Sequence, residues 1–391
     1  MPDLFEIIVG TYEQYLLGYK ISNTDNVSKQ EYNMVKSFAT HSHVSSIRSV
    51  ASNKNILASG GADDSVYLYD LHNRVEFGRL MHHNGRCDHI RSLFACHVKM
   101  GDEIIYFDKF YIFLCVYADT VNCIAFTPDG SHLFSCSSDG TIAAIRCGNW
   151  QTEKHWQKSH KGSAVNTLAI HPTGKIALST GADGILRTWN LVKGRQAYAT
   201  NLVPRLRSDG RNVNILKWSP NGEKYLLAVN QRIDVYSVKS AGIDNEIKFD
   251  SKIICVEFLN DDLIAAGLEN GQIKFYDLEK SVEIVEVVAH DKRVKCMAFK
   301  DNLLVTASSN GEIKLWRYRR RRLDMLQKVN CDVRITCLSL ALFNVRIRAC
   351  CVIINNYQRI HLRDGFMGLS TGQFHAFAKS ALFDKVPMTL K

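Results

Sequence analysis

One pattern of four residues recurs along this chain and constrains its fold more than any other feature. A His is followed, about twenty positions later, by a Ser or Thr, then by an Asp or Asn, and then by an aromatic position. The hydroxyl residue stands four positions before the Asp or Asn, and the aromatic position six after it. A repeat near 40 residues with this spacing is typical of a propeller blade of four short strands. The four copies are His160, Ser179, Asp183 and Trp189; His43, Ser59, Asp63 and Tyr69; His290, Thr306, Asn310 and Trp316; and His83, Ser135, Asp139 and Ile145.

Runs of β-branched and aromatic residues, separated by Gly, Asn and Asp turns, extend this pattern to seven blades. A fourth and a fifth blade keep the alternation of strand and turn residues but lack the full four-residue pattern. In the fifth, Ala266 stands at the Ser position and Asn270 at the Asp position. The seventh is assembled from residues 7–19, as middle strands, and residues 333–342, as the innermost strand. Joining both ends of the chain in one blade closes the ring and removes exposed sheet edges. The other six cover residues 41–80, 82–145, 158–200, 212–238, 253–278 and 293–318.

The prediction is therefore an all-β chain with a seven-bladed propeller over residues 1–342 and a basic C-terminal tail over residues 343–391. The repeated His, Ser and Asp also resemble a Ser-His-Asp catalytic triad. Because the set recurs in several blades, we interpret it as a buried hydrogen-bond network, which stabilises only when every member is satisfied. The chain shows no phosphate-binding glycine loop, no HExxH, no GxSxG and no dinucleotide fingerprint. We expect no enzyme activity, no cofactor and no small-molecule substrate.

The second blade is interrupted. His83 and Asp139 lie 56 positions apart, whereas His43 and Asp63 lie 20 apart, so residues 86–118 form an insert. Its Cys and His residues match no compact zinc-binding spacing, and we predict no metal site. The insert is either a surface loop or a translated intron. The Cys and His residues concerned are Cys87, His89, Cys96, His97 and Cys115.

The positive charge of the chain is confined to its last fifth. Residues 317–391 hold 14 Lys and Arg but 4 Asp and Glu, whereas residues 1–316 hold 35 of each kind. An arginine run follows the strand that ends at Trp316. It is either a solvated loop between the third and fourth strands of its blade, or a signal for nuclear import, or a contact with RNA phosphates, which Arg binds with two hydrogen bonds. The run comprises Arg317, Arg319, Arg320, Arg321 and Arg322.

Compartment signals are few. The N-terminus has no basic segment followed by an apolar stretch, so no signal peptide is expected, and no run of about 18 apolar residues predicts a membrane span. Cys123, Cys136, Cys255 and Cys296 fall at strand positions, where a free thiol packs as a small hydrophobic group. Reduced thiols favour the cytosol or the nucleus.

Several segments resemble the p21-activated protein kinase-interacting protein 1 family of WD-repeat proteins. They are IIVGTYEQYLLGYKI, HHNG, AIHPTGKIALSTGADGILRTWNLVKGR, LKWSPNGEKYLL and AHDKRVKCMAF. The resemblance covers roughly residues 5–85 and 119–340; the insert and the tail, which lacks the Lys-rich end typical of the family, depart from it. It implies a scaffold of the nucleus and nucleolus that binds pre-ribosomal assembly factors during large ribosomal subunit biogenesis and negatively regulates p21-activated kinase.

Two function classes follow. The first is this protein-interaction scaffold, and the second is an RNA-binding propeller that contacts ribosomal RNA through the basic C-terminal segment. The sequence does not show which face of the propeller binds partners, because loop residues follow no repeat.

Overall fold

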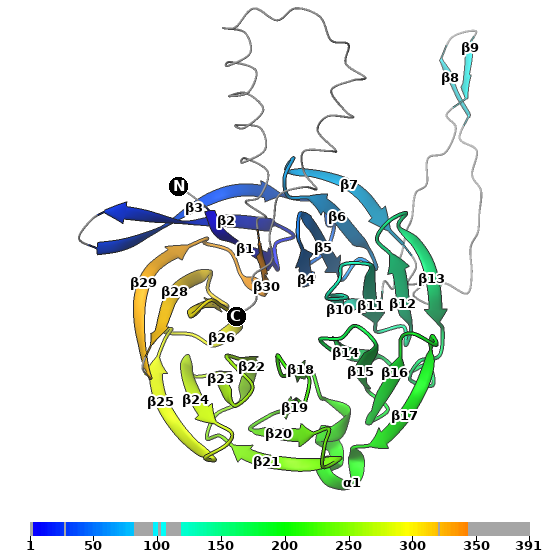
Figure 1. The fold of residues 1–391 in the computed structure, drawn as a ribbon. Coiled ribbons are helices and arrows are strands. Elements are labelled where there is room, and N and C mark those ends of the chain that lie inside the picture. The colour runs from blue at the N-terminus through cyan, green and yellow to red at the C-terminus, as the bar shows by residue number, and fades with distance from the viewer. Residues whose placement is uncertain are drawn as a thin grey trace, which may run out of the picture. The chain divides into compact units, whose positions relative to one another are not determined.

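Seven antiparallel sheets of four strands each surround a common centre in the described part of the chain (Figure 1). The computed structural model describes residues 3–26, 29–81, 97–100, 103–106, 119–319 and 321–342. The chain divides into two compact units, Met1–Phe343 and Asn344–Lys391, and every described residue belongs to the first.

Each sheet is one blade, numbered here in chain order, with the blade that contains both ends of the ring as blade 7. The strands of blades 1 to 3 are β4 (Ile47–Asn53), β5 (Ile56–Gly61), β6 (Val66–Asp70) and β7 (Val75–Leu80); β10 (Val121–Phe126), β11 (His132–Ser137), β12 (Ile142–Arg146) and β13 (Gln151–Trp156); and β14 (Val165–Ile170), β15 (Ile176–Gly181), β16 (Ile185–Asn190) and β17 (Arg195–Asn201).

The strands of blades 4 to 6 are β18 (Ile215–Trp218), β19 (Lys224–Val229), β20 (Arg232–Ser237) and β21 (Gly242–Lys248); β22 (Ile253–Phe258), β23 (Leu263–Leu268), β24 (Gln272–Asp277) and β25 (Val282–Val288); and β26 (Val294–Lys300), β27 (Leu303–Ser308), β28 (Glu312–Arg319) and β29 (Arg322–Asn330). Blade 7 comprises β30 (Ile335–Ala341), β1 (Asp3–Thr11), β2 (Leu16–Asn26) and β3 (Lys29–Thr40), in that order from the centre outward.

Other elements of the described chain are short. The helical segments are α1 (Val203–Leu206) and η1 (Arg207–Arg211), which connect blades 3 and 4. Strands β8 (His97–Met100) and β9 (Glu103–Tyr106) pair antiparallel within the insert; the rest of residues 86–118 lies outside the described residues. No helix in the described ranges is long and apolar enough to cross a membrane.

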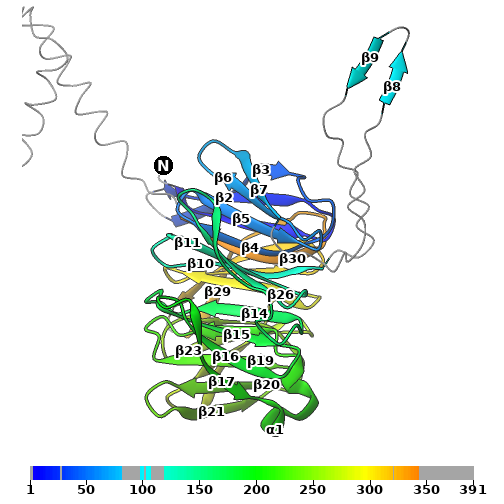
Figure 2. The ribbon, with the colours of Figure 1, turned by 90° about the vertical axis from the view of Figure 1, so that its right-hand side faces the viewer.

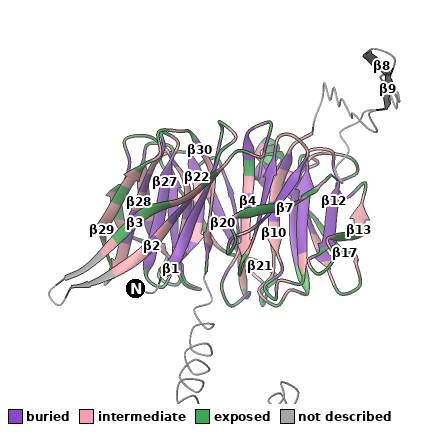
Figure 3. Cartoon of the chain, turned by 90° about the horizontal axis from the view of Figure 1, so that it is seen from above, coloured by how far each residue is buried: buried purple, intermediate pink, exposed green. Residues whose placement is uncertain are grey.

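Within a blade, the middle strands are the most buried and the outermost strand is the most exposed (Figure 3). The second strand of blade 5, β23, is buried along its whole length, whereas the outermost strand of blade 3, β17, is exposed along its whole length. The apolar cores lie between neighbouring blades, and each core joins residues from two of them. Between blades 6 and 7, for example, Ile7, Val9 and Tyr19 pack with Val305 and Leu315. Each blade thus stabilises the next one, as in other repeat proteins.

The ring closes where β1 pairs with β30. Ile8 lies opposite Ser339 and Val9 opposite Leu338, in an antiparallel register. Strand β30 also lies between β4 and β26, the innermost strands of blades 1 and 6 (Figure 2). A buried carboxylate supports the closure, because Glu6 of β1 accepts two hydrogen bonds of 2.7 and 2.8 Å from the Arg74 guanidinium of blade 1.

The predicted architecture is confirmed. The described chain consists of strands joined by turns, with almost no helix; it forms seven blades, and residues 7–19 and 333–342 meet in one of them. The four cysteines predicted at strand positions, Cys123, Cys136, Cys255 and Cys296, all lie in strands and are free. Cys255 and Cys296 are free, and each thiol donates a hydrogen bond of 3.4 Å to a carbonyl of the following blade.

The tight contact at the closure gives a direct test. A Cβ added to Gly10 would lie 2.6 Å from both the Cys337 sulfur and the Ile47 Cγ2. We therefore expect Gly10→Ala to lower the free energy of unfolding by about 1–3 kcal/mol in urea unfolding, because β1 and β30 must separate to admit the methyl group. The matched control is Gly148→Ala, whose Cβ would meet nothing within 4 Å. Equal stability of the two variants would contradict a tightly packed closure.

Candidate functional site

The repeated pattern forms a complete network in blade 3. The His160 ring lies 2.8 Å from both the Asp183 carboxylate and the Ser179 hydroxyl, through Nδ1 and Nε2 respectively. The Trp189 indole N–H donates to the same hydroxyl at 2.8 Å. Arg187 of the third strand, which is not part of the repeated pattern, donates a hydrogen bond of 2.9 Å to Asp183. All four predicted residues are thus brought together, and a fifth joins them.

Blade 1 repeats this arrangement. His43 Nδ1 lies 3.0 Å from the Asp63 carboxylate and Nε2 lies 2.7 Å from the Ser59 hydroxyl. The aromatic position holds Tyr69, whose hydroxyl lies 3.4 Å from Ser59 Oγ. The carboxylate of Asp63 also accepts the Val44 amide at 3.0 Å, so it fixes the turn that carries the His.

Blade 6 departs from the prediction at one position. His290 Nε2 meets Thr306 Oγ1 at 2.8 Å, and the Trp316 indole donates to the same oxygen. The acidic partner of His290 Nδ1 is Glu312, at 2.7 Å. The prediction that Asn310 is this partner is wrong. The Asn310 side-chain oxygen instead accepts the Glu312 amide within the turn. The longer Glu side chain, two residues further on, reaches the imidazole.

Blade 2 is described in part. Ser135 is fully buried, and Asp139 accepts hydrogen bonds of 2.7 Å from the amide and the hydroxyl of Thr141. His83, the predicted His of this blade, lies outside the described residues.

The burial of these networks argues against the triad interpretation. Ser59, Ser179 and Thr306 have no exposed surface, and each hydroxyl already contacts both an imidazole and an aromatic side chain. A catalytic nucleophile has to reach a substrate, whereas these groups are enclosed. They stabilise the turns at one end of blades 1, 3 and 6.

The side-chain charges follow from the same burial. Burial lowers the pKa of His160 and His290 despite their carboxylate partners. For Asp63 and Asp183 burial raises the pKa, but hydrogen bonds from His43 to the first, and from His160 and Arg187 to the second, outweigh it and leave both pKa values lower than usual. The networks therefore hold a carboxylate at neutral pH.

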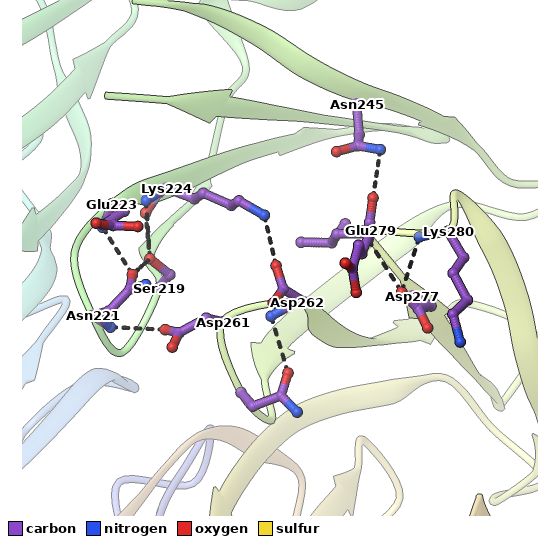
Figure 4. A network of polar contacts seen from close by, with 12 residues as sticks. Ser219, Asn221, Glu223, Lys224, Asn245, Asp261, Asp262, Asp277, Glu279 and Lys280 are labelled. Carbon is purple, nitrogen blue, oxygen red and sulfur yellow. Dashed lines mark hydrogen bonds and ion pairs between the residues drawn. The ribbon is translucent and has the colours of Figure 1, made fainter. Parts of the chain in front are cut away.

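Two faces of the ring can now be distinguished. The histidine face is the end where the inner strands begin; Val165 at the start of β14 pairs with Gly181 at the end of β15, just before Asp183. The opposite face carries the turns at the other strand ends. There, neighbouring blades 4 and 5 are tied by polar contacts (Figure 4): Asp261 accepts the Asn221 amide at 2.8 Å, and Asp262 accepts from Lys224 Nζ at 2.7 Å.

The arginine run lies on the opposite face, at the β28–β29 hairpin. It is not simply a loop, since Arg317 and Arg319 belong to β28 and Arg322 begins β29. Arg317 donates to the Tyr32 hydroxyl at 2.9 Å and stacks on its ring, so it contributes to packing between blades 6 and 7. Arg319, Arg321 and Arg322 are exposed, and Arg320 lies outside the described residues.

No group of three or more His, Cys, Asp or Glu side chains is placed to hold a metal ion within the described ranges. The side chains of the insert's Cys and His residues, Cys87, His89, Cys96, His97 and Cys115, lie outside the described part of the structure.

Comparison with known proteins agrees with this architecture. The family model described as "WD domain, G-beta repeat" matches residues 32–70, 113–143, 151–190 and 282–317. The chain is therefore a WD-repeat propeller protein.

Relatives named p21-activated protein kinase-interacting protein 1 match most of the chain. The Danio rerio protein "p21-activated protein kinase-interacting protein 1-like" is 33% identical over 86% of this chain and 81% of its own length. The Homo sapiens protein "p21-activated protein kinase-interacting protein 1" is 32% identical over 87% of this chain and 78% of its own length. The Saccharomyces cerevisiae "Protein MAK11" is 26% identical over 86% and 83%. The chain belongs to the p21-activated protein kinase-interacting protein 1 family.

The shared hydroxyl of blade 3 gives a test of the bracing role. Ser179→Ala leaves His160 Nε2 and the Trp189 N–H buried without a partner, and each such loss costs about 1–3 kcal/mol. We expect the free energy of unfolding in urea to fall by about 2–4 kcal/mol. Ser240→Ala, at an exposed turn, serves as the control and should change stability by less than about 0.5 kcal/mol. A neutral Ser179→Ala variant would contradict the network.

Acid should destabilise the ring in two steps. Because the folded pKa of His160 and His290 lies below the ordinary 6.5, their stabilisation is complete above that pH and is lost as pH falls through the lower folded values. The lowered pKa of Asp63 and Asp183 likewise gives stability above pH 3.8 that is lost in stronger acid. Urea unfolding between pH 8 and pH 3 should show stability falling below pH 6.5; stability that rises there would contradict these pKa directions.

Proposed function

We propose that this chain is a protein-interaction scaffold that acts in large ribosomal subunit biogenesis and negatively regulates a p21-activated kinase. The observation that carries the proposal is membership, over most of the ring, in a family whose relatives are named for interaction with that kinase. A closed propeller suits such a role, because its blades support one another and its two faces remain available to partners.

Ribosome assembly and kinase regulation both call for protein partners, so one ring can serve both by binding different partners. We propose pre-ribosomal assembly factors as the first class of partner and the kinase as the second. We further propose that the protein works in the nucleus, within the nucleolus, where large-subunit precursors are assembled.

The second candidate function is contact with ribosomal RNA. It is favoured by the exposed Arg319, Arg321 and Arg322 at one hairpin tip, since Arg binds phosphate with two hydrogen bonds. Arg317 is excluded from this surface because it contacts Tyr32.

The decisive experiment is affinity purification of the tagged full chain from cells, followed by mass spectrometry. We expect enrichment of large-subunit precursor proteins and of a p21-activated kinase over a control that carries the tag alone. Recovery of neither group of proteins would overturn the scaffold proposal. Location is checked by microscopy of the tagged chain, and a signal outside the nucleus would overturn the proposed location.

The RNA alternative is separated by a charge variant. The variant combines Arg319→Gln, Arg321→Gln and Arg322→Gln. If protein contacts hold the chain on large-subunit precursors, recovery of the precursors should stay within about twofold of that of the unaltered chain. If contacts with RNA phosphates do so, recovery should fall several-fold. The matched control removes three exposed cations elsewhere, through Lys154→Gln, Lys193→Gln and Arg195→Gln.

A further inference from the structure

The centre of the ring opens on the histidine face as a cavity of about 520 Å³. Its lining is polar, and four cationic side chains from three consecutive blades contribute to it. They are Arg48 of blade 1, Arg293 and Lys295 of blade 6, and Arg334, which precedes the inner strand of blade 7. No Asp or Glu is among the lining residues of this cavity, which we call the basic mouth.

The cations occupy repeated positions of the blades. Arg48 and Lys295 each follow the fully buried first residue of an inner strand, and Arg293 and Arg334 each precede such a residue. In blades 2, 3 and 4 the position equivalent to Arg48 holds Asn122, Asn166 and Asn214, which also line the cavity. One side of the mouth is therefore cationic and the other carries amides.

These four cationic side chains are not held in ion pairs by the described residues. None of the four forms an ion pair with a carboxylate in the described part of the chain, whereas Lys224 and Lys274 on other surfaces do. Arg334 instead stacks on the exposed Tyr12 ring, at 5.1 Å from its centroid. Like charges gathered in one concave site repel each other and attract a ligand anion, because a concave wall focuses the field.

The amide side indicates what kind of anion fits. The side-chain nitrogens of Asn122 and Asn166 donate to the Val165 and Arg211 carbonyls, at 2.7 and 2.9 Å. The carbonyl oxygen of each side chain has no hydrogen-bond donor among the described residues, and it can accept one. A peptide main chain offers an N–H at nearly every residue, whereas a phosphodiester backbone offers none.

The surroundings of the mouth favour a short ligand. Asp291 and Asp332 are exposed two positions before Arg293 and Arg334, and exposed Glu13 accepts the Arg334 amide at 2.9 Å. These carboxylates repel a long polyanion laid across the face, while a few acidic side chains placed in the mouth meet the cations directly.

We propose that the basic mouth binds an acidic peptide segment of a protein partner. Carboxylates of the segment pair with Arg48, Lys295, Arg293 and Arg334, and its main-chain N–H groups donate to the Asn side chains. This proposal rests on the scaffold function above and adds the chemistry by which one partner is recognised.

The test uses the full chain and two fluorescein-labelled probes: a twelve-residue peptide of alternating Glu and Gly, and a twelve-nucleotide oligouridylate. The variant Arg48→Gln with Lys295→Gln should weaken peptide binding at least about tenfold in fluorescence anisotropy at low salt. The control, Lys193→Gln with Arg195→Gln, removes the same charges from an exposed turn and strand of blade 3 and should change affinity less than about twofold. The exposed single variant Arg334→Gln gives a second measurement if the double variant unfolds at a lower temperature.

Three results would overturn the proposal. The first is no peptide binding by the unaltered chain, and the second is equal weakening of peptide binding in the two double variants. The third is that the double variant Arg48→Gln with Lys295→Gln loses oligouridylate binding but keeps peptide binding. Affinity purification separates this failure from that of the scaffold proposal. If the unaltered chain and the mouth variant recover the same partners, the mouth proposal fails and the scaffold stands; if the unaltered chain recovers none, the scaffold itself fails.

Discussion

The pairing of β1 with β30 is the interaction on which the rest of this structure depends. Each apolar core lies between two blades, so a blade without a neighbour exposes a buried face, and an open ring would leave two such faces. The pairing joins residues separated by more than 300 positions, and it also places β30 against β4 and β26. Closure of a loop that long has a large entropic cost, which many contacts formed together repay.

The histidine networks add local rigidity to this ring. In blades 1, 3 and 6 they fix the turn before the inner strand by joining it to the turn between the second and third strands. Blade 4 lacks the pattern. Its buried Asp234 instead accepts hydrogen bonds from Arg205 at 3.0 Å and from Arg232 at 2.7 Å. In blades 1, 3, 4 and 6, which contribute residues to the basic mouth, buried polar contacts thus restrict the motion of the blade, and this preorganises that part of the mouth for a ligand.

The sequence predicted those parts of the fold that repeat. Spacing alone found the networks of blades 1 and 3, and it located the blade assembled from both chain ends. It failed at Asn310, because the geometry of the folded turn decides that position 312, rather than position 310, faces His290. It also gave no sign that Arg317 meets Tyr32, since that contact joins opposite ends of the chain. The basic mouth was missed for the same reason: Arg48 lies about 250 positions from Lys295, and only closure brings them to one cavity.

Native-state hydrogen exchange followed by mass spectrometry tests the role of the closure most directly. If β1 and β30 unfold only with the whole ring, amides of 335–341 and 5–11 will exchange as slowly as those of β14, with opening free energies equal to the global free energy of unfolding. If the β30 amides instead exchange several kcal/mol more easily than those of β14, the ring opens locally at this pairing, and the account of a single closed unit is contradicted.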